Sequence, residues 1–205
     1  MKWRAKILMA TVPIVFFTGA ALTGIPFENA FANGSAEKNV VIERIVAYLK
    51  GKDVDMKEDK LKAVVHKVYD EAEQYDLDYR LALAVIKVES NFKHDVVSRK
   101  GARGLFQIKP SLAKYIAKDA GVTLNGDQSL HEPDKNIKLG LYHLSKLVED
   151  FKNLPTALHA YNVGITKTKA RRAGKGEPNT TFTKRVLKEY EKNLSVLPER
   201  DDTER

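Results

Sequence analysis

The sequence predicts an all-α domain with a cleft. Apolar residues recur at three- and four-residue spacings through most of the 205 residues, as they do on the buried side of helices. No segment alternates apolar and polar residues between turn signals, so strands should be minor. The length and the single continuous set of helical stripes suit one domain with one core.

Residues 1–32 are predicted to be a signal peptide. Lys2, Arg4 and Lys6 form a positive start, residues 7–27 carry no charge, and Ala-Phe-Ala at 30–32 matches a signal-peptidase site. The uncharged run is long enough to span a bilayer, so an uncleaved membrane anchor is the alternative. Its interspersed threonines, glycines and prolines favour cleavage. In either case the body of the protein is expected in the periplasm or cell envelope.

Composition excludes several kinds of site. With no cysteine there can be no disulfide, thiolate metal site or lipid-modified cysteine. Five scattered histidines form no ligand-spaced pair, so neither a metal nor another cofactor is expected. Losing residues 1–32 removes three basic residues and one acidic residue, which leaves 32 against 26, a net charge of +6. That excess suits an anionic polymer, but aromatics do not interleave with the basic residues as in a nucleic-acid surface.

Two helices are expected before the main motifs. Residues 33–65 are predicted to be a connector that contains one short amphipathic helix ended by Gly51, and a second helix should run from about 56 to 75. Their apolar stripes are Val40, Val41, Ile45, Val46 and Leu49 in the first and Leu61, Val64, Val65, Val68 and Tyr69 in the second.

The remaining helices follow from their start and stop signals. Asp76 or Asp78 can cap a helix that ends near residue 90, and Pro110 opens another that Gly121 stops. Long stripes predict helices over 134–151 and 180–194, with a shorter helix from Pro155 between them. Residues 196–205 are almost wholly charged and are expected to be a flexible tail.

Glu89 is the first candidate for chemistry. It ends a nearly uninterrupted apolar helix and shares a helical face with Ala82, Val85 and Ile86. A carboxyl group held against apolar neighbours is poorly solvated when charged, so the pKa of Glu89 should rise. A general acid near neutral pH needs such a pKa. The alternative is a solvated glutamate at a helix end with no role.

Four motifs occur in a fixed order around it. Glu89-Ser90 is followed by Ser98, then by a glycine-rich turn that spans Gly101, Gly104, Gln107 and Pro110. Further along come Asn136-Ile137 with Gly140, Tyr142 and Leu144, and finally Ala157-Leu158-x-Ala160-Tyr161-Asn162-x-Gly164. Together these motifs resemble the soluble lytic transglycosylase family, lysozyme-like enzymes that cut bacterial peptidoglycan. The resemblance covers roughly residues 66–195.

The resemblance implies a role for each matching residue. Glu89 would be the single catalytic acid and base. Ser98, Gln107, Tyr161 and Asn162 would bind the glycan strand in a substrate cleft, with Tyr161 and Asn162 facing the glutamate. Ser90 would fix the local backbone. Asn136 is expected to brace its helix rather than touch substrate. Phe106 and Phe182 depart from the family's usual methionine and tyrosine.

A lone carboxyl predicts an unusual outcome. Most glycosidases place two carboxyls across the scissile bond, and Asp95, the only other acid between Glu89 and Gln107, lies beyond the helical face. The family's reaction would cut the bond between N-acetylmuramic acid and N-acetylglucosamine without water and leave a 1,6-anhydromuramoyl end. The alternatives are a goose-type-lysozyme-like hydrolase and an inactive glycan-binding scaffold. The expected partner is the glycan strand of peptidoglycan, with no nucleic acid, and with a membrane contact only if the N-terminal segment stays uncleaved.

Overall fold

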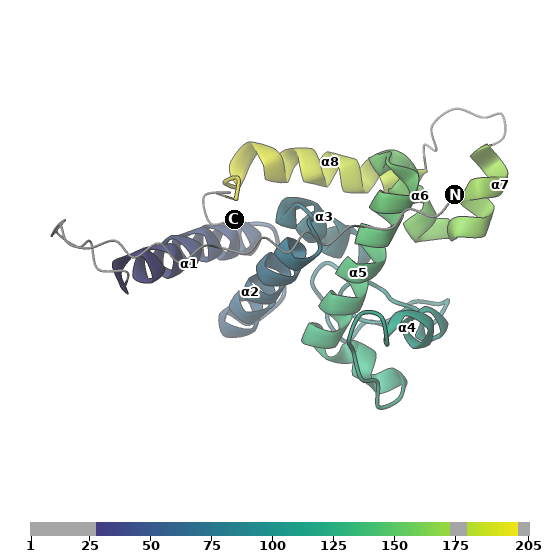
Figure 1. The fold of residues 1–205 in the computed structure, drawn as a ribbon, viewed down its shortest axis with the longest axis horizontal. Coiled ribbons are helices and arrows are strands. Elements are labelled where there is room, and N and C mark those ends of the chain that lie inside the picture. The colour runs from purple at the N-terminus through teal and green to yellow at the C-terminus, as the bar shows by residue number, and fades with distance from the viewer. Residues whose placement is uncertain (1–27, 173–179, 201–205) are drawn as a thin grey trace, which may run out of the picture.

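The computed structural model describes residues 28–172 and 180–200, and every regular element in these ranges is helical (Figure 1). Two isolated antiparallel bridges, Val97 with Arg103 and Arg103 with Ile108, replace strands there. This confirms the all-α prediction. The elements are α1 (Glu28–Lys50), α2 (Glu58–Gln74), α3 (Tyr79–Glu89), α4 (Pro110–Ile116), the 3-10 helix η1 (Asp127–His131), α5 (Pro133–Phe151), α6 (Leu154–Val163), α7 (Ile165–Arg172) and α8 (Thr181–Val196).

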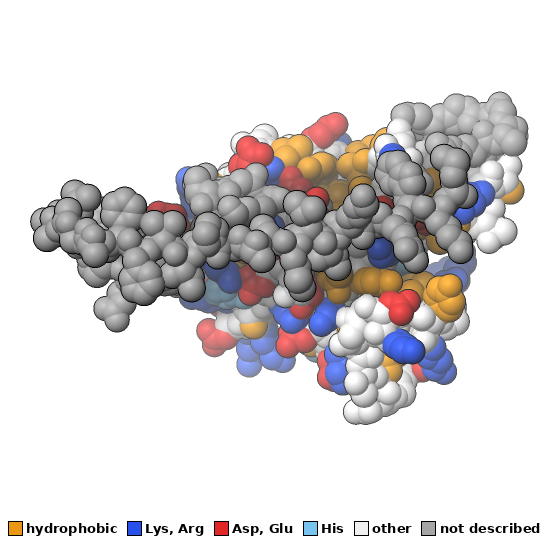
Figure 2. Space-filling view, in the orientation of Figure 1, with side chains coloured by type: hydrophobic (Ala, Val, Ile, Leu, Met, Phe, Trp, Pro, Cys, Tyr) orange, Lys and Arg blue, Asp and Glu red, His pale blue; other side chains and the backbone are white. Residues whose placement is uncertain are grey.

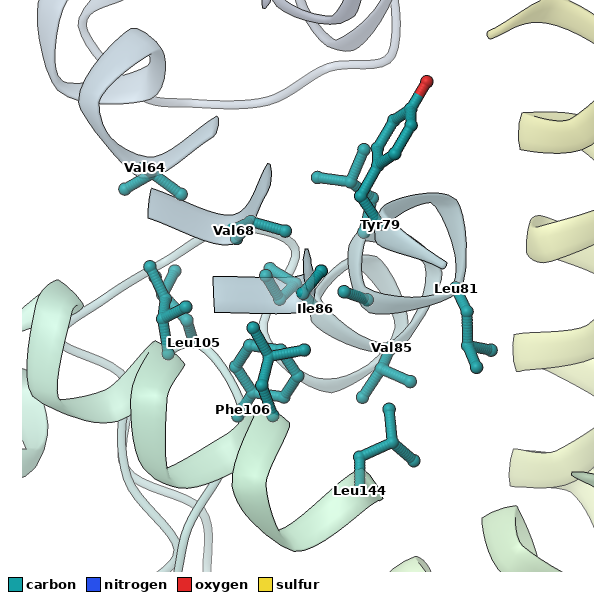
Figure 3. Packing of buried hydrophobic residues seen from close by; sticks show 14 of the residues in the cluster. Val64, Val68, Tyr79, Leu81, Val85, Ile86, Leu105, Phe106 and Leu144 are labelled. Carbon is teal, nitrogen blue, oxygen red and sulfur yellow. The ribbon is translucent and has the colours of Figure 1, made fainter. Parts of the chain in front are cut away.

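Helix α3 lies at the centre of the packing. It contacts α8 most extensively and also packs against α2, while α5 packs against α2 and α6 (Figure 1). Figure 3 shows Val85 and Ile86 of α3 directed toward Phe106 of the loop after it and Leu144 of α5. These residues are buried, so α3 is held from several sides. Burying each large apolar side chain contributes about 1.5–3 kcal/mol to folding.

Helix α1 differs from the short helix expected in a connector. It runs from Glu28 to Lys50, and its buried side is Ile42, Ile45, Val46 and Leu49, whereas Val40 is 59% exposed. Ile42 begins the three- and four-residue spacing that faces α2, which leaves Val40 on the opposite side. These residues share one hydrophobic core with α2 and α3. The segment before residue 66 is therefore a structural part of the domain.

The C-terminal residues also differ from the flexible tail expected over 196–205. Leu197 is buried, and the carbonyl oxygen of Pro198 accepts a hydrogen bond from the Tyr79 hydroxyl. Arg200 lies with its guanidinium 4.2 Å from the ring centroid of Tyr69 and donates to the carbonyl oxygen of Tyr69. The chain thus docks on α2 and α3 as far as Arg200, and residues 201–205 lie outside the described ranges.

The helices α2, α3, α5, α6 and α8 match expectation closely, whereas α4 starts at Pro110 as expected but ends at Ile116, before the predicted stop at Gly121. Helices α7 and η1 had no clear signal in the sequence. All five stripe residues of α2 are buried. On the apolar side of α5, Ile137, Leu141, Leu144 and Leu147 are buried and Val148 is half-buried. No described helix is long and apolar enough to cross a membrane. The positive start and the uncharged run at 7–27 lie outside the described residues, so the signal peptide and cleavage after Ala32 stay predictions.

Candidate active site

The helix that carries Glu89 is fixed at its N-terminus by an ionic network. The Asp78 side chain caps α3 by accepting from the backbone N–H of Arg80 at 2.8 Å, and the Arg80 guanidinium pairs with the same carboxylate at 2.8 Å. The Tyr190 hydroxyl of α8 donates to Asp78 at 2.9 Å, and the Asn193 amide donates to the carbonyl oxygen of Arg80 at 2.9 Å. These contacts tie the start of α3 to α8.

Glu89 is the last residue of α3 and is only partly exposed. Ala82, Val85 and Ile86, which share its face, are fully buried. Loss of solvation raises the pKa of Glu89 to about 7, and the positive charge of Arg185 on α8 opposes that rise. The expected rise in pKa is confirmed, and its cause is the predicted one. At neutral pH a large share of Glu89 therefore keeps its proton.

The chain turns sharply just after the glutamate. The Ser90 hydroxyl donates to the carbonyl oxygen of Ile86 at 3.2 Å, which fixes the end of the helix as expected. Asn91 and Phe92 then both adopt left-handed backbone conformations, with φ of 51° and 65°. Such a conformation is rare for an aromatic residue and costs of order 1–3 kcal/mol. Phe92 is 1% exposed, and burial of its ring in the core holds the turn in place.

The glycine-rich turn is held by Asn136, which is fully buried in α5. Its side-chain oxygen accepts from the backbone N–H of Phe106 at 2.8 Å, and its amide nitrogen donates to the carbonyl oxygens of Arg103 at 2.9 Å and Leu130 at 2.8 Å. Gly104 has φ of 75°, and a Cβ there would lie 2.3 Å from the Leu130 carbonyl oxygen. Asn136 thus braces the turn rather than its own helix.

Ser98 and Gln107, the two predicted glycan-binding residues in and just before the turn, each use one polar atom in a hydrogen bond that shapes the turn. The Ser98 hydroxyl oxygen accepts from the backbone N–H of Ala102 at 3.0 Å, which leaves its proton to donate elsewhere. Gln107, with φ of 49°, donates its amide nitrogen to the carbonyl oxygens of Gly104 at 2.9 Å and Val96 at 3.2 Å. Its side-chain oxygen is the function that remains for a ligand.

Tyr161 of α6 connects the turn to Glu89. Its hydroxyl donates to the carbonyl oxygen of Phe106 at 2.7 Å. Burial raises the pKa of Tyr161 well above its usual range, and the nearby Glu89 carboxylate adds to the rise. The hydroxyl therefore stays protonated as a donor. The ring lies parallel to that of Phe182, with centroids 6.3 Å apart, so Phe182 holds Tyr161 by stacking.

The structure thus brings together Glu89, Tyr161 and the turn that carries Ser98 and Gln107. Asn162, by contrast, is exposed at the end of α6. Sequence reasoning missed two neighbours of this group, Arg185 and His143.

His143 lies beside Tyr161, with ring centroids 5.4 Å apart, and burial lowers the pKa of His143 to about 4, so it is neutral. Its spacing of three from Gly140 and seven from Asn136 places it on the same side of α5. That spacing is a signal that could have identified it.

The chain matches the family model described as the transglycosylase SLT domain over residues 68–182. It is 31% identical over 124 residues to the transglycosylase of Enterobacteria phage PRD1, which covers 60% of this chain and 40% of that protein. It is 34% identical over 91 residues to the soluble lytic murein transglycosylase of Salmonella typhimurium, which covers 43% of this chain and 14% of that protein.

A solved structure of the lytic transglycosylase Slt of Pseudomonas aeruginosa, an inactive glutamate-to-glutamine mutant, has 27% sequence identity and a TM-score of 0.58. The match covers 65% of this chain and 24% of that one, so this chain spans less than half the length of each of these three proteins. The all-α fold is therefore the lysozyme-like fold of lytic transglycosylases. Because the family model matches more than half of the chain, this protein belongs to the transglycosylase SLT domain family.

Proposed function

We propose that this protein is a peptidoglycan lytic transglycosylase that acts in remodelling or turnover of the cell wall. The observation that carries the proposal is Glu89, a carboxyl with a pKa of about 7 at the end of a buried helix in a chain of this family. The relatives named as murein transglycosylases support the substrate, and their action on the wall supports an exported location. We also propose that residues 1–32 are a signal peptide that directs this export.

In the proposed reaction Glu89 first acts as an acid. It protonates the oxygen that joins the muramoyl C1 to N-acetylglucosamine, and that bond breaks. The neighbouring N-acetyl group stabilises the cationic centre. Glu89, now a carboxylate, removes the proton from the muramoyl C6 hydroxyl, whose oxygen attacks C1. The product is a 1,6-anhydro ring, and no water is consumed.

The side chains around Glu89 support this sequence of steps. The free hydroxyl proton of Ser98 and the free amide oxygen of Gln107 offer one donor and one acceptor to the sugar. Tyr161 positions the turn through the carbonyl oxygen of Phe106. Asn162 is proposed to contact the strand at the exposed end of α6. Holding the C6 hydroxyl near C1 gives it an effective concentration that a free water molecule does not match.

Muropeptides released from purified sacculi are expected to carry 1,6-anhydromuramoyl ends. In the described ranges no second carboxylate contributes to the pKa of Glu89, and Asp95 is exposed, so no second carboxyl is seen to activate water or act as nucleophile. Mass spectrometry separates the anhydro product from the hydrated one by the mass of one water. Predominantly hydrated products would support the hydrolase instead, and no products at all would support the inactive scaffold.

The pH dependence of kcat/KM should follow the protonation of Glu89. Because the acid must carry its proton, activity is expected to be constant below pH 7 and to fall as pH rises through about 7. Arg185 lowers the pKa of Glu89, so Arg185→Gln should move this fall to higher pH. A profile measured on soluble glycan strands checks both statements. A fall that stays at the same pH in Arg185→Gln would contradict the assignment of this limb to Glu89.

A further inference from the structure

A basic groove lies between the end of α3 and α8, beside the proposed active site. It has a volume of about 330 Å³ and is lined by Lys87, Val88 and Asn91 from the end of α3 and by Arg185, Lys188 and Lys192 from α8. The one acidic lining residue is Glu189, so the groove has a net charge of +3. Glu189 is already paired with Lys52 at 2.7 Å and with Lys192 at 3.4 Å.

The other basic groups of the groove have no carboxylate partner within 4 Å among the described residues. Lys87 donates to two neutral oxygens, the backbone carbonyl of Lys52 and the side chain of Asn91, both at 2.6 Å. An ammonium has three N–H donors, so Lys87 keeps one for a ligand. Within the described part of the chain, Arg185 and Lys188 form no ion pair, so no neighbouring carboxylate neutralises their charge. Uncompensated cations that line one hollow favour an anionic ligand.

Arg185 connects this groove to the reacting centre. It lines the groove, and its charge also acts on the carboxyl of Glu89. In peptidoglycan the stem peptide is attached to the muramic acid ring, the same ring whose C1 reacts in the proposed function. The stem carries free carboxylates within a few residues of that ring. Arg185 belongs both to the groove and to the surroundings of Glu89. The groove is therefore placed where a stem peptide leaves the reacting muramoyl ring.

We propose that the basic groove binds carboxylates of the stem peptide and so favours strands that still bear their stems. This inference rests on the proposed transglycosylase function. Lys87, held by Asn91, and Lys188 would contact the carboxylate, while Val88 offers an apolar surface to a stem side chain or backbone. Glu189 and its two lysines would keep the groove walls in place.

The test compares two substrates and three proteins. Wild type, Lys188→Glu and Lys184→Glu are assayed on glycan strands with intact stems and on strands stripped of stems by an amidase. Lys184 is an exposed lysine of α8 outside the groove, so its reversal is the matched control. For intact strands we expect Lys188→Glu to raise KM about tenfold, equivalent to about 1.4 kcal/mol, with kcat unchanged. On stripped strands all three proteins should agree within about twofold, the scatter expected for a surface change.

The outcomes separate the two proposals. An equal loss on both substrates, or no loss on intact strands, would overturn stem binding and leave the transglycosylase function standing. No cleavage of either substrate by wild type would overturn the function itself. Binding of a soluble stem peptide to wild type and to Lys188→Glu gives a readout without turnover. If a phosphate-bearing wall polymer loses affinity in Lys188→Glu and the stem peptide does not, the assignment to carboxylates is wrong.

Discussion

Replacing Glu89 with glutamine is expected to reduce kcat by about a hundredfold to ten-thousandfold, the usual effect of losing a general acid or base. Glutamine keeps the size and position of the side chain at the end of α3 but has no proton to give to the leaving oxygen. The measurement is release of anhydro ends from sacculi. The control is Asp95→Asn, which removes an exposed carboxyl after the sharp turn and should leave kcat within about twofold. Activity within a few-fold of wild type in Glu89→Gln would refute the assignment.

The same substitution should make the protein more stable at high pH. The pKa of Glu89 is raised from 4.5 to about 7 in the folded state, so between these values the folded chain binds more protons than the unfolded chain. Raising the pH through this window therefore lowers the free energy of unfolding of wild type, by on the order of 3 kcal/mol. Glutamine does not titrate. Urea unfolding should show the variant more stable than wild type at pH 8, with that advantage lost near pH 4.

Gly104→Ala is expected to lower the free energy of unfolding by about 3 kcal/mol or more, because it combines a backbone clash with left-handed strain. The added Cβ would lie 2.3 Å from the carbonyl oxygen of Leu130 and 2.4 Å from the amide nitrogen of Asn136. The turn would have to leave Asn136, which holds Phe106, and kcat should fall with stability. Urea unfolding and the strand-cleavage assay measure the two effects.

Gly101→Ala is the matched control. Gly101 has the same φ of 75°, but a Cβ there would meet nothing within 4 Å. Its cost should therefore be the conformational strain alone, about 1–2 kcal/mol. If Gly104→Ala lowers the free energy of unfolding more than Gly101→Ala does, the difference measures the cost of the clash between the turn and its neighbours. Equal destabilisation would show that strain, and not contact with Leu130 and Asn136, explains the need for glycine at 104.

Local patterns were enough to predict most of the helices and the setting of Glu89. The spacing of Ala82, Val85 and Ile86 predicted a poorly solvated carboxyl, because helical geometry decides which residues share a face. The position before an apolar run narrowed the cap of this helix to Asp76 or Asp78, and the structure shows that Asp78 is the cap. These inferences need only residues close together in sequence.

Some of the features that were missed depend on contacts distant in sequence. Arg185 lies almost a hundred residues after Glu89, and nothing near it in sequence shows that its charge acts on that carboxyl. The contacts that Ser98 and Gln107 make within their own turn are local and were missed for another reason: residue spacing does not show which polar group of a side chain the turn itself uses. The predicted stripe of α1 is correct at Ile45, Val46 and Leu49 but wrong at Val40, which is exposed, and it omits the buried Ile42.

The extensive packing of α3 on α8 has a consequence for when the proposed active site is assembled. The N-terminal half of α3 is tied down by Tyr190 and Asn193, which lie more than 100 residues later in the chain. A chain that emerges from its N-terminus has no α8 to place against α3 until residues 181–196 have been made, and contacts this distant form slowly. The Glu89 helix therefore gains its final position only after α8 has emerged. The proposed wall-cutting activity is thereby delayed by topology alone until α8 has docked.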